Sequence, residues 1–317
     1  MMAFSRWTNN TEMNFTEIVS NIFNHGEWFE PNIDPYNKES LPYTVKSVFT
    51  ENQEILLNDS KIYYNSFIFE YSRVRPGEEN NPLYASRIQT ISSLVIVYSD
   101  GKDTQFIINK SGNLARTVLR KLNNHTNNNT VKVSPYNISR DFFDWLIYIL
   151  LEGDMAVLNE EPTIELKKIV GFKGTTDDEG QKLAEIIGSG DRIMKAISTL
   201  AFLLESDEVE YVKPLLAYNN DKTDQDHVVE ILLRLNGTID FNFEKYTGSF
   251  LFEEEYRLKT KLILLVSLEI IPMIISKYGE SIEEDAWNTE IKISMLDSIG
   301  KQILSKVQEK VEVIRKT

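Results

Sequence analysis

Three charged residues of this 317-residue chain have the types and spacing that metal-dependent phosphate chemistry requires. Asp154, Glu165 and Lys167 lie within the stretch GDMAVLNEEPTIELKK, residues 153–168. Side chains two residues apart in a strand point to the same face, so Glu165 and Lys167 are expected side by side. Asp154 and Glu165 could then share a Mg²⁺ ion through carboxylate oxygens while Lys167 orients an attacking water.

This pattern resembles the D-x(n)-E-x-K signature of restriction-type nucleases, and the resemblance implies a Mg²⁺-dependent nuclease or phosphodiesterase. Three observations favour an ordinary hairpin. With 31 Glu and 23 Lys, about two Glu-x-Lys triplets are expected by chance, and two occur, at Glu165 and Glu290. The helix expected to end at Leu151 runs almost directly into Asp154, where such nucleases have a strand. The surrounding half of the chain is also acidic, which disfavours a DNA substrate.

A second group of residues could bind anions. A helix expected over residues 114–122 carries a small basic face, and further arginines are expected on nearby strands. Arginine binds phosphate or carboxylate groups with two hydrogen bonds at once. The candidate contacts to nucleic acid, or to an acidic face of another subunit, are Arg73, Arg75, Arg87, Lys110, Arg116, Arg120 and Lys121. The simpler interpretation is a solvated helix face.

The helix expected over residues 289–315 has a one-sided apolar stripe. Its members recur at spacings of 3, 4, 4, 4 and 3 residues, and the opposite face is polar. This period fits an α-helix that buries one face. The stripe, a candidate partner interface, consists of Leu296, Ile299, Ile303, Val307, Val311 and Ile314. Pairing with another chain, including a second copy, is one interpretation; packing on the chain's own helix at 262–275 is the other.

The composition excludes several classes of site. The chain has no cysteine, so disulfides, thiolate zinc sites and cysteine nucleophiles are excluded. Its three histidines, His25, His125 and His227, have no spacing that suits a zinc site or a Ser-His-acid set. No cofactor is therefore expected, apart from Mg²⁺ if the nuclease interpretation holds.

Charge is unevenly distributed. Residues 1–150 contain 14 Lys and Arg against 16 Asp and Glu, a net charge of −2, whereas residues 151–317 contain 20 against 32, a net charge of −12. An acidic surface repels phosphate backbones, which disfavours nucleic acid as a partner of the second half. A protein partner is expected instead.

A cytoplasmic location is expected. The N-terminus has no basic segment followed by an apolar run, so it does not have the pattern of a secretory signal. The most apolar window, residues 262–275, is 14 residues long and contains Ser267, Glu269 and Pro272, which indicates a buried helix and not a membrane span.

Periodicity predicts an α+β fold: an N-terminal region rich in antiparallel sheet, then a mixed α/β region that ends in two long helices. Helices are expected at 15–23, 114–122, 139–151, 177–189, 191–204, 252–278 and 289–315. Strands are expected at 45–49, 63–73, 88–98, 104–109, 211–217, 228–235 and 238–243, with two more in the stretch 153–168. The turns at Asp100-Gly101 and Asn236-Gly237 indicate tight hairpins.

The polar run NNHTNNNT predicts a linker at 123–130 between an antiparallel-sheet domain, 1–122, and an acidic α+β domain, 131–317. Because strong catalytic motifs are lacking, the sequence favours a non-catalytic interaction protein that binds another macromolecule, above all a protein. The composition, rich in Asn, Ile and Lys, suits an AT-rich genome and suggests a mobile-element role such as phage defence or counter-defence. The alternatives are the metal-dependent nuclease and a nucleic-acid-binding subunit that uses the helix of Arg116.

Overall fold

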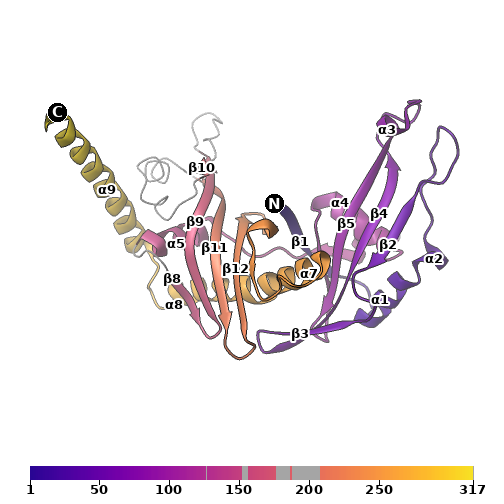
Figure 1. The fold of residues 1–317 in the computed structure, drawn as a ribbon, viewed down its shortest axis with the longest axis horizontal. Coiled ribbons are helices and arrows are strands. Elements are labelled where there is room, and N and C mark those ends of the chain that lie inside the picture. Colours follow the sequence, from indigo (N-terminus) through magenta and orange to yellow (C-terminus); the bar gives the residue numbers. More distant parts are fainter. Residues whose placement is uncertain (126, 152–155, 176–185, 188–207, 317) are drawn as a thin grey trace. The chain divides into compact units, whose positions relative to one another are not determined.

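The computed structural model describes residues 1–125, 127–151, 156–175, 186–187 and 208–316 (Figure 1). The chain has an α+β fold, as predicted, and every strand pair described here is antiparallel. It divides into two compact units. The N-terminal unit comprises Met2–Pro135 and Glu253–Leu262; the C-terminal unit comprises Met1, Tyr136–Phe252 and Ile263–Thr317. The predicted linker at 123–130 and the independence of the two predicted domains stay predictions.

The N-terminal unit is built on a sheet with the order β1-β6-β5-β4-β2, to which β7 adds beside β1 and β3 beside β4. The strands are β1 (Met2–Asn9), β2 (Tyr43–Ser47), β3 (Gln53–Leu57), β4 (Ser60–Val74), β5 (Ile88–Ser99), β6 (Thr104–Ile108) and β7 (Val131–Val133). The helices are α1 (Phe15–Phe23), α2 (His25–Trp28), α3 (Tyr84–Arg87), α4 (Gly112–Leu122) and the 3₁₀ turn η1 (Asn128–Thr130). The β5–β6 hairpin turns at Gly101, whose positive φ of 92° suits glycine.

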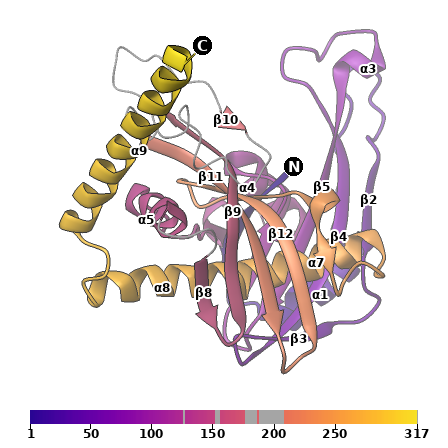
Figure 2. The same cartoon turned by 60° about the vertical axis from the view of Figure 1, so that its left-hand side comes forward.

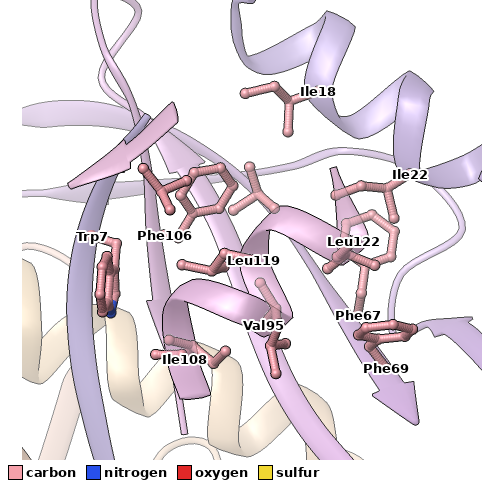
Figure 3. Close-up of a cluster of buried hydrophobic side chains, with 14 of the residues drawn as sticks. Trp7, Ile18, Ile22, Phe67, Phe69, Val95, Phe106, Ile108, Leu119 and Leu122 are labelled. Carbon is pink, nitrogen blue, oxygen red and sulfur yellow. The ribbon is translucent and has the colours of Figure 1, made fainter. Parts of the chain in front are cut away.

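One face of this sheet is covered by α1 and α4 (Figure 3). The alternating strand residues Phe67 and Phe69 point to that face, and Trp7 pairs directly with Phe106 in the neighbouring strand. Both helices are amphipathic, so each contributes one apolar stripe to the same core, including Ile18 and Leu119. On the other face the hydroxyl of Ser66 lies 2.9 Å from that of Thr260, in the segment Glu253–Leu262.

The sheet of the C-terminal unit has the order β10-β9-β11-β12-β13, with β8 beside β9 and β14 beside β12. Figure 1 shows β9, β11 and β12 side by side. The strands are β8 (Ala156–Glu160), β9 (Thr163–Thr175), β10 (Ile186–Ile187), β11 (Glu208–Asn220), β12 (Gln225–Arg234), β13 (Ile239–Phe241) and β14 (Thr247–Gly248), and the 3₁₀ turn η3 (Phe243–Lys245) follows β13.

Two helical segments follow this sheet at the end of the chain, as predicted. The first combines α7 (Glu255–Leu265), the π-helical turn η4 (Val266–Ile270) and α8 (Ile271–Glu283), and the second is α9 (Thr289–Lys316). The helix α5 (Arg140–Leu151) directly follows Ser139, whose hydroxyl accepts a hydrogen bond from the N–H of Phe142 (3.1 Å). None of the described helices is both long and apolar enough to cross a lipid bilayer.

Several local predictions were wrong. No element is predicted for residues 2–9, but they form β1, which pairs with β6 and β7. The strand β3 and the short helix α2 were missed. Within the predicted helix at 177–189, the structure describes Ile186–Ile187, and these two residues form the strand β10. The rest of that range and the whole predicted helix at 191–204 lie outside the described residues.

Candidate functional site

The proposed metal hairpin exists as a hairpin, since β8 and β9 pair directly. Glu165 and Lys167 lie on the same side of β9 and form an ion pair with each other. Both are partly exposed. Asp154 lies outside the described residues, so the metal pair of Asp154 and Glu165 stays a prediction. Within the described part of the chain, no group of three histidine or carboxylate side chains is arranged to hold a metal ion.

Arg87 does not belong to a surface for anions. Its guanidinium is 3% exposed and donates to both carboxylate oxygens of Asp34, at 2.7 Å from Nη2 and 3.0 Å from Nε. The hydrogen bond from Arg87 holds the pKa of Asp34 below its usual range. Arg87 also lies over the ring of Tyr36, 4.5 Å from its centre. This arginine joins the loop after α2 to the end of α3, which is a structural role.

The other predicted basic residues do not form one cluster. Arg73 lies on β4 with Nη2 3.5 Å from the Oε1 of Gln89, and Arg75 is exposed just after that strand. Lys110 is partly buried, which lowers its pKa, and Arg116 lies over the ring of Trp7 at 5.7 Å. Arg120 and Lys121, both on α4, line one hollow together.

That hollow, the α4 cleft, has a volume of about 610 Å³. It is lined by the cations Arg120 and Lys121, the rings of Trp28, Phe29 and His125, and the acid Glu30, with Thr117 and Asn124. The Nζ of Lys121 donates to the Oδ1 of Asn32 (3.1 Å) and lies 5.9 Å from the centre of the Phe29 ring. Cations beside aromatic rings can hold an anion that carries a planar group.

Burial controls protonation in the α4 cleft. It lowers the pKa of Lys121, and burial together with the positive charge of Arg120 lowers the pKa of His125. Neither ring nitrogen of His125 has a hydrogen-bond partner among the described residues. Both effects favour the neutral imidazole, which could donate one hydrogen bond and accept another.

Sequence reasoning missed the aromatic half of this cleft. Trp28 and Phe29 lie in a segment that the prolines Pro31 and Pro35 mark only as irregular, and His125 lies in the predicted linker. The available signal was the cluster of aromatic residues in GEWFEP, residues 26–31. What brings it to α4 is the packing of α1 and α4 on one sheet, which is not visible in the local sequence.

The predicted apolar stripe of α9 is largely exposed. Among the 28 residues of this helix, all of which the structure describes, Ile299 is the one that is buried. Leu296, Val307, Val311 and Ile314 are exposed, and Ile303 is partly so. Two further apolar residues join them, Ile293 at 62% and Leu304 at 57% exposure. The stripe is therefore mostly not covered by the described part of the chain, and Ile299 is its one buried member.

The first turns of α9 are held by Asp141 at the start of α5. Its carboxylate accepts hydrogen bonds from the hydroxyl of Tyr278 (2.5 Å) and the indole N–H of Trp287 (3.0 Å), and it forms an ion pair with Lys292. Burial opposes the charged form, but these three donors outweigh it and lower the pKa of Asp141. Beyond this anchor α9, drawn in yellow, leaves the end of α8 as a separate rod in both views (Figure 1, Figure 2).

Comparison with known proteins adds no assignment, because no family model and no curated protein matches this chain.

Proposed function

We propose that this chain works by binding another protein through α9, without catalysis of its own. The observation that carries the proposal is the row of large apolar side chains that α9 exposes, including Leu304 and Val307. A helix in water gains most of its stability by packing an apolar face. Fully burying one Leu, Ile or Val side chain contributes about 1.5–3 kcal/mol. A groove or helix on a partner would supply the surface that the described part of this chain does not.

The test is a comparison of two double variants that add the same charge to opposite faces of α9. In Leu304→Lys with Val307→Lys the new charges fall on the apolar row; in Ser305→Lys with Gln308→Lys they fall on the polar face. Tagged full-length chains are purified from the producing cells, and each co-purifying protein is then made separately and titrated against all three chains. The proposal expects binding by the wild type and the polar-face variant and at least a tenfold loss in the apolar-row variant. Equal affinity for all three would contradict it.

A second candidate function is anion binding in the α4 cleft, favoured by the placement of Arg120 and Lys121 beside three aromatic rings. A nucleic-acid strand would place its phosphates on the cations and a base on a ring. Trp28 lines the cleft, so its fluorescence reports binding of a short single-stranded oligonucleotide. Lys121→Gln should weaken that binding and reduce its salt dependence. Binding unchanged by salt and by Lys121→Gln would remove this candidate. A role in phage defence or counter-defence stays a prediction.

A further inference from the structure

A row of positions on the largely exposed side of α9 has the same spacing in both chain directions. Its positions are separated by 3, 4, 3, 1, 3, 4 and 3 residues, so they are symmetric about a point between Ile303 and Leu304. At 3.6 residues per turn all of them fall within an arc of about 100°. The palindromic row consists of Ile293, Leu296, Gly300, Ile303, Leu304, Val307, Val311 and Ile314. The buried Ile299 lies just outside this arc.

We propose that the partner of α9 is the α9 of a second copy, paired antiparallel about a twofold axis at Ile303 and Leu304. This proposal rests on the proposed function, because it names the protein that α9 binds. A twofold axis places residue i of one helix opposite residue j of the other when i and j are equally far from the centre. Leu296 then lies opposite the partner's Val311, and Leu304 lies opposite the partner's Ile303. Each member of the row therefore meets another member.

Gly300 fits this arrangement. A Cβ added at Gly300 would meet nothing within 4 Å in the described part of the chain, so no described neighbour requires a glycine there. Glycine in a helix interior is less favourable than alanine. In the antiparallel pair Gly300 lies opposite the partner's Val307, where a missing side chain gives the branched valine room to approach the helix.

Charge favours the antiparallel direction over the parallel one. Glu290 lies in the first turn of α9, and Arg315 and Lys316 lie in the last. Antiparallel pairing brings Glu290 within about one turn of the partner's Arg315 and also sets the two helix dipoles in opposite directions. Parallel pairing would place each of these charges next to its own copy. The antiparallel pair is therefore the one in which both the apolar residues and the end charges are complementary.

Disulfide trapping tests both the partner and the direction, because the chain has no cysteine of its own. A disulfide requires Cα atoms within about 7 Å. In the proposed dimer Leu304→Cys lies next to its own copy, whereas Leu296→Cys lies about 22 Å from its copy at 1.5 Å per residue. Leu304→Cys should therefore cross-link alone, and Leu296→Cys should cross-link only when mixed with Val311→Cys. Ser305→Cys, at the same height on the polar face, is the control and should stay uncrosslinked.

Contrary results are equally clear. A parallel pair would cross-link Leu296→Cys alone and would not give the mixed product, which would overturn the direction. Absence of all disulfides, with a monomer in sedimentation equilibrium of the wild type at about 100 μM, would overturn the second copy as partner. In that case the proposed function would still hold if a different protein bound the wild type but not the Leu304→Lys, Val307→Lys double variant. If no such protein were found, both the proposed function and the α9 dimer would be refuted.

A separate variant tests the role of the glycine. In Gly300→Leu the new Cβ meets no described neighbour, and leucine is a better helix former than glycine. At a concentration where the wild type is monomeric, the variant's thermal stability should therefore not fall. The larger side chain would collide with the partner's Val307, and dimer affinity should fall about tenfold or more. An unchanged or tighter dimer would show that α9 does not pair at this register.

Discussion

His227 should make the C-terminal unit sensitive to mild acid. Its side chain is fully buried on β12, where Nδ1 lies 2.8 Å from the hydroxyl of Tyr246. That hydroxyl accepts a hydrogen bond from the N–H of Phe250 (3.0 Å), so its own proton is available to Nδ1. Burial lowers the pKa of His227 from about 6.5 to about 4, although Asp226 acts in the opposite direction.

The sign and size of the effect follow from proton linkage. The unfolded chain takes up a proton at this position below pH 6.5, whereas the folded chain does so only near pH 4. Stability contributed by the neutral ring is therefore present above pH 6.5 and is lost as the pH falls towards 4. The free energy of unfolding should fall by about 2 kcal/mol between pH 8 and pH 5, and by about 3 kcal/mol by pH 4.

The measurement is urea unfolding of wild type and His227→Phe at several pH values between 8 and 4. The variant keeps an aromatic ring of similar size and should be less stable at pH 8 by about 1–3 kcal/mol, because Tyr246 loses an acceptor. Its stability should nevertheless fall less between pH 8 and pH 5. Acid groups such as Asp34 titrate in both chains and cancel in the difference. Parallel pH profiles for the two chains would refute the reasoning.

Three further predictions concern one ion pair within the N-terminal unit, the contacts of Asp141 within the C-terminal unit, and the β8–β9 hairpin. Asp34→Ala leaves the buried guanidinium of Arg87 without its carboxylate and should lower the free energy of unfolding by about 3–5 kcal/mol. The control Glu54→Ala removes one partner of the exposed ion pair with Lys61 and should lower it by less than about 1 kcal/mol. Similar losses for the two variants in urea unfolding would contradict this. Asp141→Ala removes the acceptor shared by Tyr278, Trp287 and Lys292. Amide hydrogen exchange should become faster in the first turns of α9 and stay unchanged in β5. Exchange in α9 at the same rate in the variant and the wild type would show that this anchor is not needed. Wild type with Mg²⁺ or Mn²⁺ should leave single- and double-stranded DNA and RNA intact; cleavage that is lost in both Glu165→Ala and Lys167→Ala would instead establish the nuclease alternative.

Elements with a strong local pattern were predictable from the sequence. The spacing of Phe15, Ile18, Val19, Ile22 and Phe23 predicts the buried stripe of α1; the first four are buried, whereas Phe23, the last residue of the helix, is exposed. The glycines of the two tight turns, Gly101 and Gly237, have positive φ. The strand β1 was not predictable in this way, because its sequence MAFSRWTN alternates only weakly and its partners β6 and β7 lie about a hundred residues away along the chain. Pairing at that distance leaves little local signal.

The candidate sites also differ in how far the local sequence predicts them. The α9 stripe was found by its period, but which of its residues face the chain depends on how the helix is anchored. Asp141 contacts Trp287, just before α9, and Lys292 in its first turn, and in this arrangement Ile299 is buried and Leu304 is exposed. Arg87 appeared to be a surface cation because charged residues are mostly exposed. Its partner Asp34 is 53 residues away, and only the fold brings them together.

The most direct test of protein binding through α9 is site-specific photo-cross-linking in the producing cells. A photoreactive amino acid is placed at Leu304, on the exposed apolar row, or at Glu309, on the opposite face of the same helix. The account predicts a discrete cross-linked protein from position 304, either a second copy of this chain or a different protein, and none from position 309. No product from position 304, or the same products from both positions, would contradict it.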